Sequence, residues 1–340
     1  MKPHHLNRRG FLSLTGMALL SESAGLPFFA KETIQTVRGP IPAEKFGLAL
    51  PHEHVLCDFI GAEKTGPHRW NADEVARTML PYLRAARAQG VAGFVDCTPA
   101  FIGRDVRLLR RLAQATGLHI VTNTGLYKEP FLPPYAFTET EDQLAARWVS
   151  EFEKGIDGAG VRPGFIKIAV NPGPLIPVQQ KIVKAAARAS RRTGMLIACH
   201  TAHGGAALET IALLQKEKLP LSRYVFVHAE GEKDRNFHVE VARAGGWVEY
   251  DAVGRRPTAE HVRLITQFLA DGLADRLLLS HDAGWYHAGE PNGGQIKAYT
   301  ALLDELIPAL EMEGLNREMR DKILIENPRR AFSLNRSALD

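Results

Sequence analysis

The fold of this chain is constrained most by a rhythm that repeats from Thr33 onward: a short apolar run, a polar turn, then a longer amphipathic stretch. Runs rich in Val, Ile and Leu predict strands at 46–50, 91–97, 119–123, 165–170, 195–199, 224–227, 247–250 and 276–279. Between and after them, amphipathic stretches predict helices at 72–89, 105–116, 141–156, 178–192, 206–216, 232–244, 259–271, 295–310 and 317–325. Several of these stretches end at a glycine suited to a helix C-cap: Gly90, Gly117, Gly194 and Gly245.

Strands that alternate with helices form right-handed βαβ units, and these units make the strands parallel. Eight such units predict a closed (β/α)8 TIM barrel, and 340 residues suit one domain of this kind. A doubly wound open sheet is the alternative. It usually has fewer strands, and no Gly-x-Gly-x-x-Gly turn follows the first strand here. We therefore expect a single catalytic barrel at residues 31–340.

The first thirty residues are expected to be a targeting segment. Two arginines precede a short apolar stretch in the run Asn7-Arg8-Arg9-Gly10-Phe11-Leu12-Ser13. This pattern resembles a twin-arginine export signal, and its apolar part is too short to span a bilayer comfortably. The alternative is a basic N-terminus with no export role. We expect an exported, periplasmic or extracellular protein whose mature chain has no membrane anchor.

Charge and cysteine content argue against a nucleic-acid-binding protein and against a fold held by disulfides or a zinc ribbon. The formal net charge is only +4 and no long Lys/Arg run occurs, so nothing favours nucleic acid as a partner. Three widely spaced cysteines, Cys57, Cys97 and Cys199, fit neither a disulfide framework nor a zinc ribbon. Each lies in or just after an apolar run, so we expect small buried thiols.

A pair of histidines follows the first predicted strand, in Pro51-His52-Glu53-His54. Because side chains alternate along a strand, His52 and His54 point to one face and Glu53 to the other. Two imidazoles on one face can share a metal ion. Alone, this pattern fits a polar strand end equally well.

Three more candidate ligands follow later strands. His200 ends the fifth predicted strand, His228 follows the sixth, and Asp282 follows the eighth. One such histidine is more often a satisfied core group. The ends of parallel barrel strands meet on one face, however, so these residues should gather with the first pair. Imidazole and carboxylate ligands suit Zn, Mn, Co or Fe.

Lys167 occupies the middle of the fourth predicted strand, within Phe165-Ile166-Lys167-Ile168-Ala169-Val170. Burial of an unpaired ammonium is costly and favours the neutral amine. Lys167 could instead pair with a carboxylate or extend its amine to solvent. Beside a metal cluster, a neutral amine can react with carbon dioxide to give a carbamate, a carboxylate on a long arm that could bridge two ions.

This pattern resembles the amidohydrolase superfamily and, within it, the phosphotriesterase-like group, which includes phosphotriesterases and related lactonases. The resemblance covers about 300 residues after the export signal. Besides the strand-end residues, it is carried by Gly39-Pro40-Ile41, Gly155-Ile156-Asp157-Gly158, Leu279-Ser280-His281-Asp282 and Glu326-Asn327-Pro328-Arg329-Arg330.

The resemblance implies a binuclear metal centre. His52, His54 and Asp282 would hold the more buried ion, and His200 and His228 the second. Carboxylated Lys167 and a hydroxide would bridge them, with zinc the first expectation and Mn, Co or Fe the alternatives. Two divalent ions lower the pKa of the shared water, and Asp282 can take its proton after attack.

Two other histidines and four loop residues are expected to lie near the metal ligands. His203 and His281 should be structural or support the ligands, with His281 facing the helix layer. In the loops, Tyr127 stands where related lactonases keep a tyrosine near the metals. Lys128 and Arg255 favour an anionic or strongly polar substrate, and Trp285 completes the candidate substrate contacts, although each could be locally packed or solvated.

We therefore expect a metal-dependent hydrolase that attacks a small-molecule lactone or other carboxylic ester, with organophosphate triester hydrolysis as a side activity. One alternative is a mononuclear deaminase or amidase, which would leave Lys167 without a bridging role. Another is a non-catalytic binding protein of the same fold. Relatives are usually homodimers, so we expect a homodimer.

Overall fold

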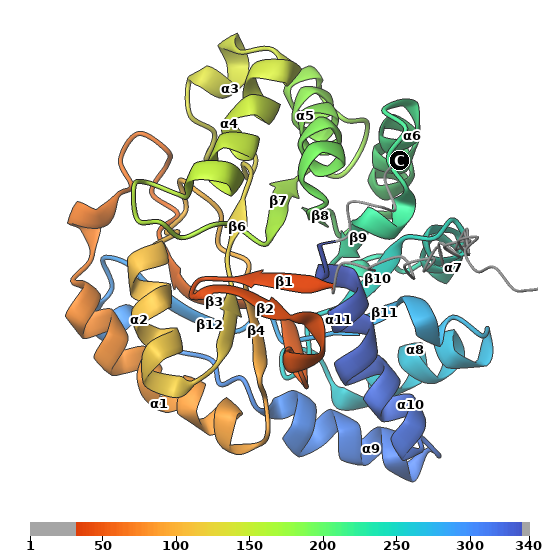
Figure 1. The fold of residues 1–340 in the computed structure, drawn as a ribbon. Helices are drawn as coiled ribbons and strands as arrows, with labels where there is room; N and C mark the ends of the chain where they lie inside the picture. The colour runs from red at the N-terminus through yellow and green to blue at the C-terminus, as the bar shows by residue number, and fades with distance from the viewer. Residues whose placement is uncertain (1–31, 335–340) are drawn as a thin grey trace, which may run out of the picture. The chain divides into compact units, whose positions relative to one another are not determined.

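The computed structural model describes residues 32–334, and these form a TIM barrel (Figure 1). The barrel has eight parallel strands in sequence order, and the third of these is divided into two short strands, β5 and β6. They are β3 (Ala49–Cys57), β4 (Gly93–Asp96), β5 (His119–Val121) with β6 (Asn123–Thr124), β7 (Phe165–Ala169), β8 (Leu196–His200), β9 (Tyr224–Val227), β10 (Trp247–Tyr250) and β11 (Leu277–Leu279).

The barrel closes between its last and first strands. The amide of Asp282 donates to the carbonyl of His52 at 3.0 Å, and that of His54 donates to Ala283 at 2.9 Å. A further strand, β12 (Gly284–His287), then runs parallel to β3 beyond the barrel rim. The first strand is thus paired along its whole length, so the histidines that it carries are held rigidly.

Helices surround the barrel. They are α1 (Ala72–Ala88), α2 (Val106–Thr116), α3 (Tyr135–Thr138), α4 (Glu141–Lys154), α5 (Pro177–Thr193), α6 (Gly204–Lys216), α7 (Arg235–Arg243), α8 (Thr258–Ala270), α9 (Ile307–Met312), α10 (Arg317–Asp321) and α11 (Asn327–Phe332). Side-chain N-caps begin several of them: Asn71 accepts from two amides of α1, and Thr140 forms a capping box with Gln143 on α4. Gly117 and Gly194 end α2 and α5 in the left-handed conformation, as predicted.

Apolar side chains fill the barrel and seal its N-terminal end. One buried cluster lies between strands and helices, and a second, which includes Phe46, Phe165 and Phe332, lies inside the barrel. An antiparallel hairpin, β1 (Thr33–Thr36) with β2 (Gly39–Pro42), lies across this end beside α11 (Figure 1). Its Ile34 belongs to the inner cluster. The opposite, C-terminal end is left for polar side chains.

The sequence-based expectation differs from the structure at several places. Helix α3 was not predicted, and the last helix, expected at 317–325, continues through a π-helical turn to Phe332. The first strand begins at Ala49 rather than residue 46 and runs to Cys57, so the histidines lie within it and not after it. The hairpin and β12 were not predicted, because β2 contains only Gly and Pro around a single Ile, and β1 and β12 are only four residues long. The segment expected to be helical from residue 295 becomes so only at Leu302, as a π-helical turn leading into α9.

Two other expectations have different outcomes. Cys57, Cys97 and Cys199 are buried free thiols, which confirms the prediction. The export signal predicted at residues 1–30 lies outside the described residues and stays a prediction. Among residues 32–334, no helix is both long enough and apolar enough to cross a membrane.

Candidate metal centre

β3 places its two histidines as the alternation of a strand requires. The ring centroids of His52 and His54 lie 5.4 Å apart inside the C-terminal end of the barrel, and both side chains are buried. Glu53 points the other way, where its carboxylate accepts hydrogen bonds from Ser280 Oγ at 2.8 Å and from the Ala283 amide at 2.9 Å. This anchors the segment after β11 to β3.

That segment carries Asp282 to the histidines. Asp282 Oδ1 lies 3.0 Å from His54 Nε2 and 3.9 Å from His52 Nε2. Its backbone is left-handed, with φ of 50°, a conformation that is uncommon outside glycine. The neighbouring His281 faces the helix layer as predicted: its Nδ1 contacts Glu53, and its Nε2 accepts from the amide of Leu302 at 2.9 Å.

Lys167 meets this group from β7. Its side chain is only 2 % exposed, and Nζ lies 3.2 Å from His52 Nε2. Within residues 32–334 it forms no ion pair, so the alternatives of a carboxylate partner and of an amine reaching solvent are both wrong. Gly125 brings the neighbouring loop against this strand, since a Cβ there would overlap the Lys167 carbonyl.

The second pair of histidines lies beside the first. His200 ends β8, His228 follows β9, and His228 Nε2 lies 2.8 Å from His200 Nδ1. The rings of His52 and His228 are 5.0 Å apart between centroids, which joins the two pairs into one group. His228 also has a left-handed backbone, with φ of 60°. His203 caps α6 through its Nδ1, which fits its expected structural role.

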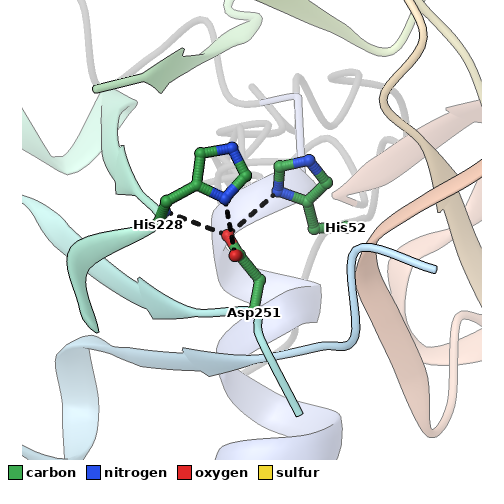
Figure 2. Close-up of side chains that lie close together, drawn as sticks. All are labelled: His52, His228 and Asp251. Carbon is green, nitrogen blue, oxygen red and sulfur yellow. Dashed lines mark hydrogen bonds and ion pairs between the residues drawn. The ribbon is translucent and has the colours of Figure 1, made fainter. Parts of the chain in front are cut away.

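Asp251 is a central member that the sequence reasoning missed. It follows β10 and is fully buried. Its carboxylate lies 2.6 Å from Nδ1 of His228 and 3.2 Å from Nδ1 of His52 (Figure 2). Glu249 Oε2 also contacts Nδ1 of His52, at 2.9 Å. These contacts turn both rings so that Nε2 faces Lys167 or His200. The rule applied to the other ligands, that polar residues directly after barrel strands gather at one end, would have found Asp251.

Burial keeps most of the imidazoles neutral. It lowers the pKa of His52 to about 3, helped by the charge of Lys167, and it also lowers the pKa values of His54 and His200. His228 is different: burial lowers its pKa, but the charge and hydrogen bond of Asp251, together with the charge of Asp282, outweigh that effect and the net shift is upward. A neutral imidazole has a free lone pair, the form in which histidine binds metals.

The group fits metal ions. His52, His54, Lys167, His200, His228 and Asp282 all line one cavity of about 50 Å³. Apart from its 3.0 Å contact with His54 Nε2, Asp282 Oδ1 is buried and accepts no well-aligned hydrogen bond in the described residues, which is costly unless a cation binds there. Two sets of three residues bring ligand atoms within 4.8 Å of one another: His52 with His54 and Asp282, and His52 with His228 and Asp251.

The predicted substrate contacts surround this cavity. Tyr127 Oη lies 3.2 Å and Lys128 Nζ 3.1 Å from nitrogens of His200. Trp285 stacks on His54 with a centroid distance of 3.8 Å, and its Nε1 donates to the Asp282 carbonyl at 2.7 Å. Arg255 Nη2 lies 2.7 Å from Asp282 Oδ2. All four therefore lie beside candidate ligands. Trp285 also packs near Phe59, which makes its side of the site aromatic, whereas Arg255 makes its side charged.

A family model described as the phosphotriesterase family matches residues 32–332, nearly all of the described chain. This chain belongs to the phosphotriesterase family. A phosphotriesterase homology protein of Mycobacterium tuberculosis is 31 % identical over 88 % of this chain and 97 % of its own length. An aryldialkylphosphatase of Saccharolobus solfataricus is 27 % identical over 91 % of this chain and 99 % of its own.

A solved structure shares the fold closely. It comes from work on engineering organophosphate hydrolysis activity from a weak promiscuous lactonase template. It is 31 % identical, covers 88 % of this chain and 99 % of its own, and superposes with a TM-score of 0.81. Together with the histidine and aspartate group, family membership makes this protein a metal-dependent hydrolase.

Proposed function

We propose that this phosphotriesterase-family chain is a binuclear metal-dependent hydrolase of a lactone or other carboxylic ester, with organophosphate triester hydrolysis as a side activity. The observation that carries the proposal is the single buried cavity lined by all six candidate ligands. His52, His54 and Asp282 would hold one divalent ion, and His200 and His228 the other, with zinc our first expectation. Bound there, the ions would polarise the substrate carbonyl or phosphoryl oxygen and make hydroxide available near neutral pH.

The chain's own residues have distinct parts in this proposal. Lys167, once carboxylated by carbon dioxide, would supply the bridging carboxylate, and its lack of any carboxylate partner in the described residues supports this. Asp282 would accept the proton of the attacking water, since its carboxylate faces the cavity. Asp251 would hold the two histidines by their Nδ1 atoms, as partners of metal-bound histidines commonly do.

Metal content per chain tests the proposal. The protein would be purified with bicarbonate and without chelator, then measured by elemental analysis alongside hydrolysis of lactones, aryl esters and an aryl phosphotriester. Two transition-metal ions per chain with ester turnover support it. One ion per chain supports a mononuclear amidase or deaminase. A folded chain that binds esters without hydrolysing them supports a non-catalytic binding protein.

A second candidate function is hydrolysis of an N-acyl compound. An N-acetyltaurine hydrolase of Rattus norvegicus is 26 % identical over 87 % of this chain and 96 % of its own length. An amide carbonyl needs the same polarisation and the same nucleophile as an ester. Including N-acetylated amines in the substrate panel separates the two candidates by their kcat/KM values.

Location and assembly complete the proposal. We propose export through a twin-arginine signal to the periplasm or beyond, because Arg8 and Arg9 precede an apolar stretch. We also propose a homodimer. Fractionation of cells that express the full chain, and light scattering of the purified protein, test these two statements separately.

A further inference from the structure

A second cavity adjoins the candidate metal centre. It measures about 390 Å³ and lies beside the segments that follow β9 and β10. His200, His228 and Asp282 line both this cavity and the small inner one. A substrate whose reacting carbonyl lies at the inner cavity can therefore extend part of itself into this larger space.

Three acidic side chains line this cavity, and all three are buried. Asp282 contacts Arg255, and Oε2 of Glu230 has no hydrogen-bond partner in the described residues. Asp251 is bound to both histidines, and Glu230 is buried, with Oε1 accepting from the amides of Asp251 and Ala252. Arg255 and Arg256 are different, because their side chains are 31 % and 42 % exposed. Arg256 has a distant partner in Glu260 at 3.9 Å. The exposed charged side chains that line this cavity are therefore both arginines.

Within the described part of the chain, the side chain of Arg255 donates a hydrogen bond from only one of its three guanidinium nitrogens. Nη2 contacts Asp282 Oδ2 at 2.7 Å, the Asp251 carbonyl at 3.4 Å and Asp251 Oδ1 at 3.9 Å. Nε and Nη1 donate no hydrogen bond within the described residues, although a guanidinium offers five N–H donors in a fork suited to oxyanions. The closest anionic partner of Arg255 is Asp282. If Asp282 binds a metal, the cation neutralises much of the Asp282 charge, and the attraction between Asp282 and Arg255 weakens.

The loop places Arg255 firmly. The carbonyl of Ala252 accepts from the amides of Arg255 at 2.9 Å and Arg256 at 3.1 Å, which closes a tight turn. Gly254 makes this turn possible, since its φ is 77° and a Cβ there would lie 2.9 Å from the Cβ of Ala301. A side chain positioned by such a turn needs less ordering on binding than one on an extended loop.

We propose that Arg255 anchors an oxyanion subsite, and that the natural substrate carries a carboxylate or similar oxyanion on the part that enters this cavity. The inference rests on the proposed hydrolase function and narrows its substrate class. The small inner cavity supports it, because Phe59 and Trp285 line that cavity and not the larger one. Phe59 lies with its ring centroid 5.2 Å from Phe131 and 5.8 Å from Trp285, so this part of the site suits an apolar or neutral part of the substrate.

Matched substrates test the subsite by kinetics. Phenyl acetate is neutral, 4-acetoxybenzoate carries a carboxylate on the leaving group, and monophenyl succinate carries one on the acyl group. For the metal-loaded enzyme, kcat/KM should favour one of the charged esters over phenyl acetate. Arg255→Gln should reduce that charged-to-neutral ratio about 10- to 100-fold, the value of a charge-assisted hydrogen-bonded pair. The ratio for Arg255→Lys should lie between those of the wild type and Arg255→Gln, because lysine keeps the charge but lacks the forked guanidinium.

A charge-matched control comes from the same region. Arg263 lies exposed on α8, outside both cavities, so Arg263→Gln removes one positive charge without touching the subsite. Its charged-to-neutral ratio should equal that of the wild type. An equal fall in both variants would show a long-range charge effect and overturn the proposal.

Binding supplies a readout independent of turnover. Succinate and propionate can each place one carboxylate at the metals, but only succinate has a second one for Arg255. Calorimetry on metal-loaded protein should show tighter binding of succinate, and Arg255→Gln should abolish the difference. Equal affinities in the wild type, or a difference that survives in Arg255→Gln, would overturn the subsite. Absence of any ester or amide turnover would instead refute the proposed hydrolase function.

Discussion

The two ends of the barrel are formed by the same strands, yet they differ in chemistry and in backbone geometry. At the N-terminal end, the ring of Phe332 packs against Phe165 at 5.5 Å and Phe46 at 6.3 Å between centroids. At the C-terminal end, His228 and Asp282 adopt left-handed backbone conformations around a buried polar cavity. The packing at the N-terminal end stabilises the fold, whereas the strained, polar arrangement at the C-terminal end destabilises it.

The largest expected effect tests the C-terminal end. Lys167→Ala should lose bound metal and lower kcat/KM by at least about a thousandfold, because the bridging carboxylate and the metals act together. A short carboxylic acid added to the buffer should partly restore both. Elemental analysis and steady-state kinetics give the answer, with Lys154→Ala on the surface of α4 as control. Unchanged metal content in Lys167→Ala would count heavily against the bridging role.

The next effect tests the N-terminal end. Phe332→Ala should lower the free energy of unfolding by about 3–5 kcal/mol, the usual cost of truncating a buried phenylalanine. Metal content and kcat/KM of the folded protein should stay close to wild type, since Phe332 lies at the other end of the barrel. Denaturant unfolding measures the change, and Phe137→Ala, at a side chain that is 54 % exposed, is the matched control. Lost metal with intact stability would contradict this division of roles.

A smaller effect concerns the side chain behind the ligands. Asp251→Asn should weaken metal binding about 10- to 100-fold, because the amide cannot accept from both Nδ1 atoms as the carboxylate does. Metal titration with a chelating indicator measures it. Asp73→Asn, at an exposed surface pair with Arg111, should leave metal affinity unchanged. Equal affinities in both variants would mean that Asp251 does not orient the histidines.

The smallest expected effect is on pH dependence and compares a histidine outside the site with those inside it. His238 of α7 is buried against Tyr250 Oη at 2.9 Å, and burial lowers its pKa to about 4. Between that value and the unfolded value of about 6.5, the unfolded chain binds more protons, so stability falls as pH falls. The loss is at most about 1.4 kcal/mol per pH unit.

Denaturant unfolding of metal-free protein at several pH values measures this dependence. His238→Gln should reduce the slope between pH 4 and 6.5, whereas His68→Gln, at an exposed position, should leave it unchanged. An identical slope in all three proteins would show that His238 is not the source. A lowered histidine pKa thus marks burial anywhere in the molecule, and only convergence with other ligands marks a site.

Much of this structure could be predicted because barrel strands carry a local signal. β9 and β10 have the predicted bounds, and the other barrel strands lie within a few residues of theirs. Residues at strand ends converge because parallel strands share one end, which is why His52, His200 and His228 could be grouped without a structure. The first strand was placed too early because Pro51 and the polar residues after it hide its continuation.

By itself, the sequence determined the eightfold alternation, the gathering of histidines and aspartate at one end, and the buried lysine among them. Each follows from periodicity or from strand direction, which are properties of neighbouring residues. Only the tertiary structure decided that Asp251 holds two histidines from different strands, that Lys167 lacks a carboxylate partner in the described residues, and that Arg255 faces Asp282. These are contacts between side chains distant in sequence, and loop conformation and ring orientation set them without leaving a local pattern.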